Sequence, residues 1–285
     1  MSSSHAYLIM AHSEPQALRL LLNLIDDERN HIYLHIDLSS NILNEENLKE
    51  TCKKSKITFI GRQKVYWAGY SQIKVTLELL KKAINGSHDY YHLISGVDLP
   101  LKTQDELHHF FNLNKGQQFV SCGMVNTWKI ASRYKYYHFE KLSAVMNRKL
   151  YRLLRYGMDF IQRLLLIDRT KKLNLEFYMG GNWFSITHDF SKYIVSQEKL
   201  ISKVFKNSFA SDEIFLPTLL MNSSFKDQVS PMMNLRYVDW KRGNPYIWQE
   251  HDFDELTNSN VFFARKFSYE HSPNIMEKIK AYLLG

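Results

Sequence analysis

Cysteine is scarce in this chain, and its scarcity excludes two common frameworks. Cys52 and Cys122 are the two cysteines among 285 residues. Two are too few for a disulfide framework, and their separation fits no zinc-binding spacing. We expect both to be buried free thiols in a reducing compartment. A chain of this length can bury enough apolar surface to fold without disulfides or a structural metal.

Long apolar runs are also missing. No stretch reaches the ~18 continuous apolar residues that span a bilayer. Residues 1–15 lack a basic region and carry a short apolar run, so we expect neither a secretory signal nor a membrane anchor there. The sequence therefore predicts a cytoplasmic protein.

Several familiar catalytic motifs do not occur. Glycine-rich loops of the GxGxxG and GxxxxGK[ST] types are absent, which argues against dinucleotide-binding and P-loop proteins. GxSxG and HExxH are absent as well. A literal DxD is present at Asp252 and Asp254, but it does not follow a core strand. We do not expect a metal site there.

Acidic residues are outnumbered, since 37 Lys and Arg against 29 Asp and Glu give a net charge of +8. Such a balance favours an anionic partner: a nucleic acid, a nucleotide or an acidic membrane surface. Twelve of the cations lie in the basic segment 129–172, against three acids. Its amphipathic part, residues 150–167, could pack on the protein surface, lie on a membrane or bind RNA. No RNA-binding motif accompanies it, so nucleic acid is not expected.

Strand-like and helix-like segments alternate in the first half of the chain, which predicts an α/β fold with a mostly parallel central sheet flanked by helices. Thr103 and Glu106 form the capping box of a further helix. The predicted strands are His5–His12, His31–Asp37, Lys56–Gly61 and Tyr90–Ser95, and the predicted helices are Pro15–Ile25 and Ser71–Ala83.

Ligands of such sheets bind at the carboxyl ends of the strands. Asp37 and Asp98 each follow a predicted strand, so we expect them at one edge of the sheet. Asp98 stands alone in the stretch HLISGVDLPLKT, without a second acid beside it.

The second half of the chain reads as further strands and helices without a linker, so we predict a single domain, 1–285. Gly180 and Gly181 break a strand over 176–187, which indicates a close backbone approach. A helix is expected over 189–205. Ser211 is the expected N-cap of a helix over 211–221, and a strand is expected over 235–240.

Three clusters could carry chemistry. Asp212 and Glu213 open the helix after Ser211, where they could complement the helix dipole; Glu213, at the edge of an apolar run, could instead serve as a general base. Two cations lie between aromatic residues in FARKF, 263–267, and could bind a diphosphate or lie at the surface. Arg236, on an interior-looking strand, needs Asp239 or a ligand phosphate as partner.

The order of these segments resembles glycosyltransferase family 14. The resemblance rests on HAYLIMAH, HIYLHID, VYWAGYSQIKVTLELL, HLISGVDLPLKT, GGNWFSIT, ASDEIFLPTLL, LRYVDW and FARKF, and it runs from His5 to Phe267. That family contains the core-2 and I-branching β1,6-N-acetylglucosaminyltransferases and the peptide O-xylosyltransferases. It implies a GT-A-type fold and an inverting transfer from a UDP-sugar that needs no metal.

The resemblance assigns roles on the donor side. It implies that Glu213 is the catalytic base and that Arg236 and Lys266 hold the UDP diphosphate. It places Asp37 at the uracil. Trp67 and Ser71 match the W-x-x-x-S-type segment that precedes a donor-side helix.

Further residues are expected to orient the substrates. Asp98 falls where most GT-A enzymes carry a metal-binding DxD, and we expect it to orient hydroxyls or to brace its loop. Arg133 resembles an acceptor-binding arginine, although the lysine that precedes it in the family is displaced to Lys129. Trp183 and Trp240 offer flat faces for sugar rings.

The expected activity is an inverting, metal-independent transfer, with GlcNAc in a β1,6-type linkage as the first donor sugar and xylose or another hexose as alternatives. The acceptor would be a glycan or lipid-linked saccharide of a surface polysaccharide, and no cofactor is expected. The nucleotide-sugar-binding half would be 1–125, the basic acceptor or membrane-side segment 126–175, and the catalytic half 176–285.

One alternative of a different class remains open. A non-catalytic protein that binds nucleotide sugars or carbohydrates would keep the same residues without turnover. Animal members of the family carry an N-terminal membrane anchor and several disulfides, which this sequence lacks. We therefore expect a bacterial-type soluble member, with peripheral contact at the inner face of the plasma membrane as one interpretation of the basic segment.

Overall fold

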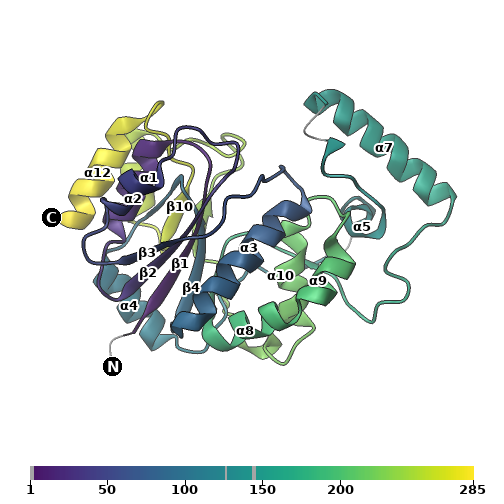
Figure 1. Cartoon of the computed structure of the whole chain (residues 1–285), viewed down its shortest axis with the longest axis horizontal. Coiled ribbons are helices and arrows are strands. Elements are labelled where there is room, and N and C mark those ends of the chain that lie inside the picture. The colour runs from purple at the N-terminus through teal and green to yellow at the C-terminus, as the bar shows by residue number, and fades with distance from the viewer. Residues whose placement is uncertain (1–2, 126, 143–145) are drawn as a thin grey trace.

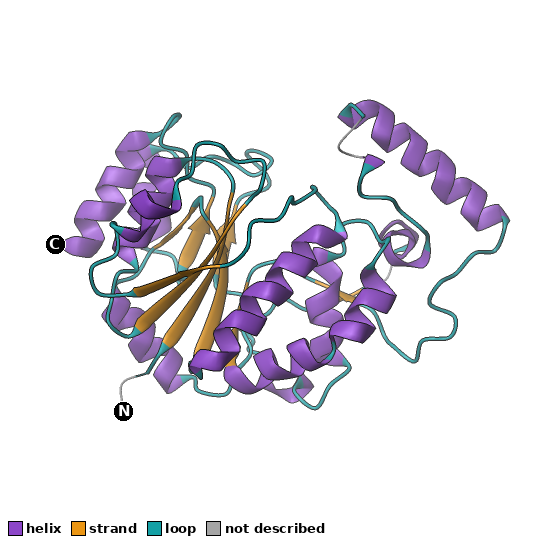
Figure 2. Ribbon diagram, in the orientation of Figure 1, coloured by secondary structure: helices purple, strands orange, loops and turns teal. Residues whose placement is uncertain are grey.

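A central five-stranded sheet organises the computed structural model, which describes residues 3–125, 127–142 and 146–285 (Figures 1 and 2). The strand order is β3-β2-β1-β4-β8, with the first four strands parallel and β8 antiparallel to β4. This confirms the predicted α/β architecture with a mostly parallel sheet. The strands are β1 (His5–Ala11), β2 (Asn30–Ile36), β3 (Lys56–Phe59), β4 (Tyr90–Ser95) and β8 (Phe184–Thr187).

Helices cover both faces of this sheet because its central strands are apolar on both sides. Tyr7 and Ile9 of β1 enter one core cluster, whereas Ala6 and Leu8 enter the other. The first cluster is covered by α1 (Pro15–Leu24), α4 (Gln104–Leu113) and α12 (Pro273–Leu284). The second is covered by α3 (Tyr70–Ala83), α8 (His188–Ser196), α9 (Glu198–Phe205) and α10 (Asp212–Met221).

A small three-stranded sheet follows the carboxyl end of β4. Its order is β5-β10-β9, and β10 pairs antiparallel with β5 and parallel with β9. The register sets Arg265 opposite Asp98. This sheet therefore brings the C-terminal part of the chain to the edge where Asp98 was expected. The strands are β5 (Asp98–Pro100), β9 (Arg236–Val238) and β10 (Phe263–Arg265).

Short elements complete the described structure. β6 (Gly123–Met124) pairs with β7 (Tyr178–Met179). Thr103 makes the predicted capping box with Glu106 at the start of α4. The remaining short helices are α2 (Glu45–Lys49), α11 (Phe253–Thr257), and the 3₁₀ turns η1 (Ile84–Gly86), η2 (Lys226–Gln228) and η3 (Glu250–Asp252).

Three local predictions were wrong in detail. The strand expected over 176–187 is two strands, β7 and β8, in different sheets, because the chain leaves one sheet at Gly180. The helix expected over 189–205 is divided at Gln197 into α8 and α9. Ser211 stands at the N-cap of α10, but it has a helical backbone and its side chain makes no capping hydrogen bond.

The basic segment extends away from the sheet (Figure 1). It contains α5 (Trp128–Lys135) and the long α7 (Arg148–Leu164), while its residues 143–145 lie outside the described part of the chain. Among the described residues, no helix has both the length and the apolar character needed to cross a membrane.

Candidate functional site

Asp37 lies at the carboxyl end of β2, as the sheet topology predicts. Its Oδ1 accepts hydrogen bonds from the backbone N–H (2.8 Å) and hydroxyl of Ser39, and its Oδ2 accepts one from the Val65 N–H at 2.9 Å. Burial opposes ionisation of this carboxyl, but these hydrogen bonds outweigh it and lower the pKa of Asp37. Asp37 is therefore an ionised anchor for two loops at the edge of the sheet.

Asp98 follows β4 as the first residue of β5 and is almost fully buried. Its carboxylate accepts hydrogen bonds from the Ser95 N–H (2.8 Å) and hydroxyl (2.6 Å) and forms an ion pair with Arg265 at 2.9 Å. The Arg265 guanidinium also lies over the Trp183 ring, 5.0 Å from its centroid. Of the two roles expected for Asp98, its contacts support bracing of the loop.

His12, which follows β1, lies among the charges of this edge. Burial lowers the pKa of His12, the positive charges of Arg265 and Lys266 lower it further, and Asp37 opposes them. These three charged groups therefore act on His12 from the carboxyl ends of β2 and β10. Arg265 keeps 19% of its side chain exposed and Lys266 is half-buried, so this cation pair can reach a ligand.

Arg236 is placed differently from Lys266. It is buried in the core, where its guanidinium lies over the Phe263 ring and donates to the Ser185 hydroxyl at 2.9 Å. Burial lowers the pKa of Arg236 to about 9. The guanidinium donates to protein acceptors through both Nη atoms, whereas its buried Nε has no hydrogen-bond partner among the described residues. Its backbone acceptors are the carbonyl oxygens of Leu93, Phe184 and Asn234.

Glu213 lies in the first turn of α10 and forms an ion pair with Arg133 of α5, whose Nη1 is 2.7 Å from Oε2. The Glu213 side chain is 37% exposed, and Oε1 accepts no hydrogen bond from the residues that the structure describes. Arg133 thus orients the carboxylate through Oε2 and leaves Oε1 without a partner among the described residues. The structure brings the predicted base and the predicted acceptor-binding arginine together.

Asp212, the neighbour of Glu213, has the environment that was expected for the base. It is buried, and its Oδ1 has no hydrogen-bond partner among the described residues. Burial and the negative charge of Glu213 raise the pKa of Asp212 to about 7. Two adjacent carboxyl groups therefore differ in environment, one shielded from solvent and one paired at the surface.

Two segments connect Glu213 with the cation pair. In the first, Gly180 donates its N–H to the Glu213 carbonyl at 2.8 Å, and Trp183, three residues on, lies beneath Arg265. In the second, Val65 binds Asp37 while the carbonyl of Ala68 accepts the N–H of Ala210 at 2.8 Å. The base and the charged sheet edge are thus connected through two short stretches of backbone.

The remaining candidates lie around this frame. Trp67 is exposed and contacts Phe209 edge to face, with 5.9 Å between ring centroids. Ser71 accepts the N–H of Tyr66 through its hydroxyl and donates its own N–H to Glu140 of the basic segment. Trp240 is exposed on the loop after β9.

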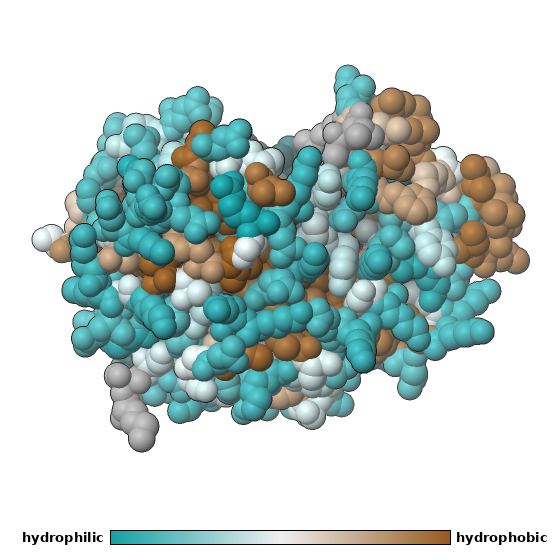
Figure 3. All heavy atoms as spheres, viewed as in Figure 1, coloured by the Kyte–Doolittle hydropathy of each residue, from teal (hydrophilic) through white to brown (hydrophobic). Residues whose placement is uncertain are grey.

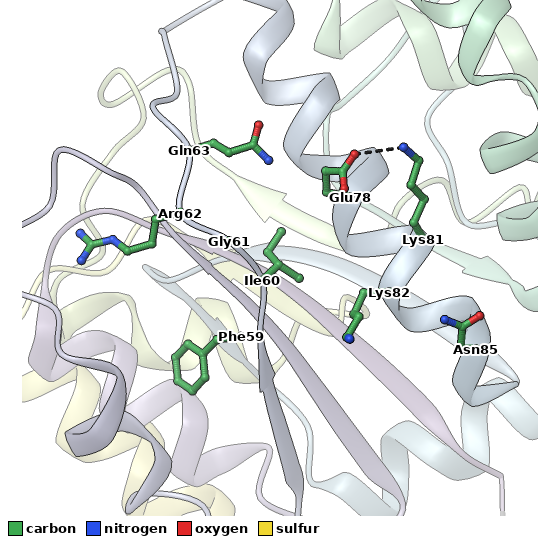
Figure 4. A pocket seen from close by; sticks show the side chains of 9 residues that line it. All are labelled: Phe59, Ile60, Gly61, Arg62, Gln63, Glu78, Lys81, Lys82 and Asn85. Carbon is green, nitrogen blue, oxygen red and sulfur yellow. Dashed lines mark hydrogen bonds and ion pairs between the residues drawn. The ribbon is translucent and has the colours of Figure 1, made fainter.

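The clearest hollow of the described surface, about 490 Å³, adjoins this site without containing it (Figure 4). It lies between residues 59–63 and α3, and its polar lining includes Arg62, Lys81 and Lys82. Arg62 also reaches the carbonyl of Asp37 at 2.9 Å. Because none of the predicted site residues lines the hollow, we do not assign the donor to it.

One group of metal-type side chains is close enough to share an ion among the described residues: Glu14, Glu270 and His271. The Glu14 carboxylate already accepts hydrogen bonds from Ser268 and Tyr269, and the other two side chains are exposed. In the DxD pair, Asp252 is buried and bound to Arg242 at 2.7 Å. Neither group gains support as a catalytic metal site.

A family model described as "Branch: Core-2/I-Branching enzyme" matches residues 5–261. The chain belongs to this family. The predicted family is confirmed.

Among curated relatives of this Core-2/I-Branching family member, xylosyltransferase 2 of Rattus norvegicus is 24% identical over 98% of the chain and 34% of the relative. Xylosyltransferase 1 of the same species is 22% identical, over 98% and 35%. The chain therefore spans about a third of the length of these relatives. Mouse xyloside xylosyltransferase 1 aligns over 92% of this chain and 96% of its own, with a TM-score of 0.40 and 12% identity. The GT-A-type description rests on the family, not on that alignment.

The sequence predictions did not include His12, although it ends the first predicted strand at the edge already marked by Asp37. Arg265 was included as one of the two FARKF cations, but its pairing with Asp98 depends on the register between β10 and β5. Asp212 was expected to complement the helix dipole, and its burial could not be predicted because it depends on how α10 packs.

Proposed function

We propose that this chain transfers a sugar from a UDP-sugar to a hydroxyl of a saccharide acceptor, with inversion and without a metal. The observation that carries the proposal is Glu213, held by Arg133 with one oxygen open and linked through 180–183 to the Arg265 and Lys266 pair. A base on one side and cations on the other are what a direct displacement at the anomeric carbon requires.

Glu213 would take the proton of the acceptor hydroxyl through Oε1 as that hydroxyl attacks the anomeric carbon. Arg133 keeps the carboxylate oriented and can also hydrogen-bond the acceptor through its remaining N–H groups. Because a single base acts on the attacking group, the bond to the diphosphate breaks on the opposite face of the sugar. This geometry inverts the anomeric configuration.

The leaving UDP gains negative charge as that bond breaks. Arg265 and Lys266 would stabilise this charge where other enzymes use a metal ion. The Asp98 carboxylate, bound to Ser95 and Arg265, holds Arg265 in place instead of binding an ion. We therefore give the second cationic position of the donor site to Arg265 rather than to Arg236.

The donor nucleotide would lie along the edge marked by Asp37, His12, Trp67 and the α3 start at Ser71. The family supports GlcNAc and a β1,6-type linkage, while the named relatives support xylose. Trp183 and Trp240 are proposed to face sugar rings. A glycan or lipid-linked saccharide of a surface polysaccharide is the proposed acceptor.

The test is UDP release from a panel of UDP-sugars in the presence of EDTA, with simple saccharides as acceptors. Glu213→Gln should lower transfer by about 10²–10⁴-fold, while UDP still raises the melting temperature of the variant as it does for the unaltered protein. Full transfer by Glu213→Gln would reject the assigned base. Activity that depends on an added divalent cation would reject metal independence.

A further inference from the structure

Helix α7 has its polar side turned toward the protein. Arg155, Asp159 and Gln162 face inward: Arg155 pairs with Asp159 at 3.2 Å, and Gln162 exchanges hydrogen bonds with the Tyr137 N–H (2.7 Å) and carbonyl (3.2 Å). His138 lies 3.7 Å from Asp159 in the same contact. An ordinary surface helix packs its apolar side inward and leaves polar groups in water. Helix α7 instead turns three polar side chains inward, beside the buried Tyr151 and the half-buried Met158.

The outward side of α7 is a continuous apolar stripe. Its residues recur at spacings of three, four and seven, which places them on one face of the helix. Leu153, Phe160 and Leu164 are 70%, 60% and 67% exposed. Figure 3 shows the hydrophobic surface gathered at this part of the molecule. The stripe consists of Leu150, Leu153, Leu154, Phe160, Ile161 and Leu164, and it continues into Leu165 and Leu166.

Positively charged side chains flank the stripe, whereas no acidic side chain of α7 is exposed beside it. Lys149, Arg152 and Arg163 are exposed beside the apolar residues, and Arg163 lies over the Trp128 ring. The one acid of α7, Asp159, is buried against Arg155. The exposed surface of α7 therefore combines hydrocarbon with cations and shows no carboxylate.

We propose that α7 is an interfacial helix that lies on an anionic membrane, with its apolar stripe at the level of the acyl chains and its cations among the headgroups. The charge on its flank is complementary to anionic lipid, and each such cation contributes about 1 kcal/mol near that surface. The hydrogen bonds of Gln162 with Tyr137 and the contact of Arg155 with the Phe209 ring keep the polar side attached to the protein while the stripe stays available.

This docking surface is connected to the proposed base. Phe209 packs against α7, with the Arg155 guanidinium 4.4 Å from its ring centroid, and its N–H donates to the carbonyl of Arg133 at 2.9 Å. Arg133 in turn holds Glu213. The inference thus rests on the proposed function and deepens it: the acceptor is a lipid-linked saccharide that meets the base close to the bilayer.

Vesicle binding without any donor or acceptor tests the surface itself. The full chain should bind phosphatidylcholine vesicles that contain phosphatidylglycerol at least about tenfold more tightly than pure phosphatidylcholine vesicles. Leu153→Ser with Phe160→Ser should weaken this binding by about tenfold or more. Lys149→Gln with Arg152→Gln should remove the preference for the anionic lipid.

Leu113→Ser is the matched control, since Leu113 is 71% exposed on α4, outside the basic segment. It should leave vesicle binding unchanged. Equal binding by the Leu153→Ser, Phe160→Ser variant and the unaltered chain would overturn the proposal. So would a stable dimer that the same variant converts to a monomer, because a second copy would then cover the stripe.

Sugar transfer separates this proposal from the one on which it rests. The Leu153→Ser, Phe160→Ser variant should keep transfer to a water-soluble acceptor and lose transfer to a lipid-linked acceptor in anionic vesicles. Loss of both transfers by this variant would overturn the membrane role. Vesicle binding by an unaltered chain that transfers no sugar would overturn the proposed function and leave the membrane surface supported.

Discussion

Two arginines near the same strands show how position decides what a cation can do. Arg236 has a structural role, since its guanidinium donates to four protein acceptors. Arg265 and Lys266, by contrast, are partly exposed at the sheet edge. The strand pattern predicted a buried arginine that needs a partner. It could not predict that carbonyl groups from other strands would provide it, because those contacts depend on tertiary packing.

Substitution of these cations should therefore give opposite phenotypes. Arg236→Ala leaves buried carbonyl groups unpaired and should lower the free energy of unfolding by about 3–5 kcal/mol. Lys266→Ala should change stability little and weaken UDP binding by at least about tenfold. Urea unfolding and calorimetric titration with UDP measure the two effects. A stable Arg236→Ala variant with weak UDP binding would return the donor role to Arg236.

Asp212 gives a residue-scale prediction with a definite pH window. Its pKa is raised from 3.8 to about 7 in the fold, so the folded state binds the extra proton between these values and stability falls as pH rises through them. Asp212→Asn removes this cost, by up to about 1.4 kcal/mol per pH unit. The gain in unfolding free energy should be larger at pH 8 than at pH 5. An equal gain at both values would contradict the raised pKa.

At the scale of elements, the strands and major helices were predictable because their apolar spacing is strong, whereas changes of direction were not. The sequence marked Gly180 and Gly181 as a close approach. It did not indicate that β7 and β8 belong to different sheets, because that depends on which strands are available to pair with each of them. It also predicted α7 as amphipathic but left open which side faces the protein. That choice is made by Asp159 and Gln162 through partners on a distant segment, 137–138.

Substitution of Gly180 and of Gly157 by alanine should affect stability for two different reasons, backbone crowding and helix propensity. A Cβ at Gly180 would lie 1.7 Å from the Ser121 carbonyl oxygen, a backbone atom that cannot turn away, whereas one at Gly157 of α7 would meet nothing within 4 Å. Gly180→Ala should destabilise the fold by about 1–3 kcal/mol and reduce transfer, because Gly180 binds the Glu213 carbonyl. Gly157→Ala should stabilise by up to about 1 kcal/mol. Equal thermal shifts in both variants would contradict this assignment.

At the scale of the whole molecule, a group of histidines lies in the interior, away from the candidate site. His5 and His92 are fully buried and hydrogen-bonded to each other at 3.1 Å, and His92 also bonds Ser185. Burial lowers the pKa of several histidines from 6.5 to about 4, and those of His5 and His92 lie well below their usual range. The residues held near 4 are His31, His35, His88, His108 and His138.

Acid should therefore destabilise the fold well before its carboxylates are protonated. In the unfolded chain these histidines bind a proton below about pH 6.5, whereas in the folded chain they do so only below about pH 4. The free energy of unfolding therefore has its full value above this window and falls as the pH decreases through it. Each such histidine adds a slope of up to about 1.4 kcal/mol per pH unit. Urea unfolding at pH 7, 6 and 5 measures it. His92→Gln should reduce the slope, and an unchanged slope would show that buried histidines are not its origin.

The contact between Ser71 and Glu140 limits which segments can be exchanged between members of the family. Glu140 belongs to the basic segment, yet its Oε2 accepts the Ser71 N–H at 3.0 Å in the first turn of α3 and lies against Gly69. A chimera that replaces residues 126–175 with the corresponding piece of a relative, in order to change the acceptor, would also remove this anion from the donor side. A successful graft must bring its own carboxylate to that position.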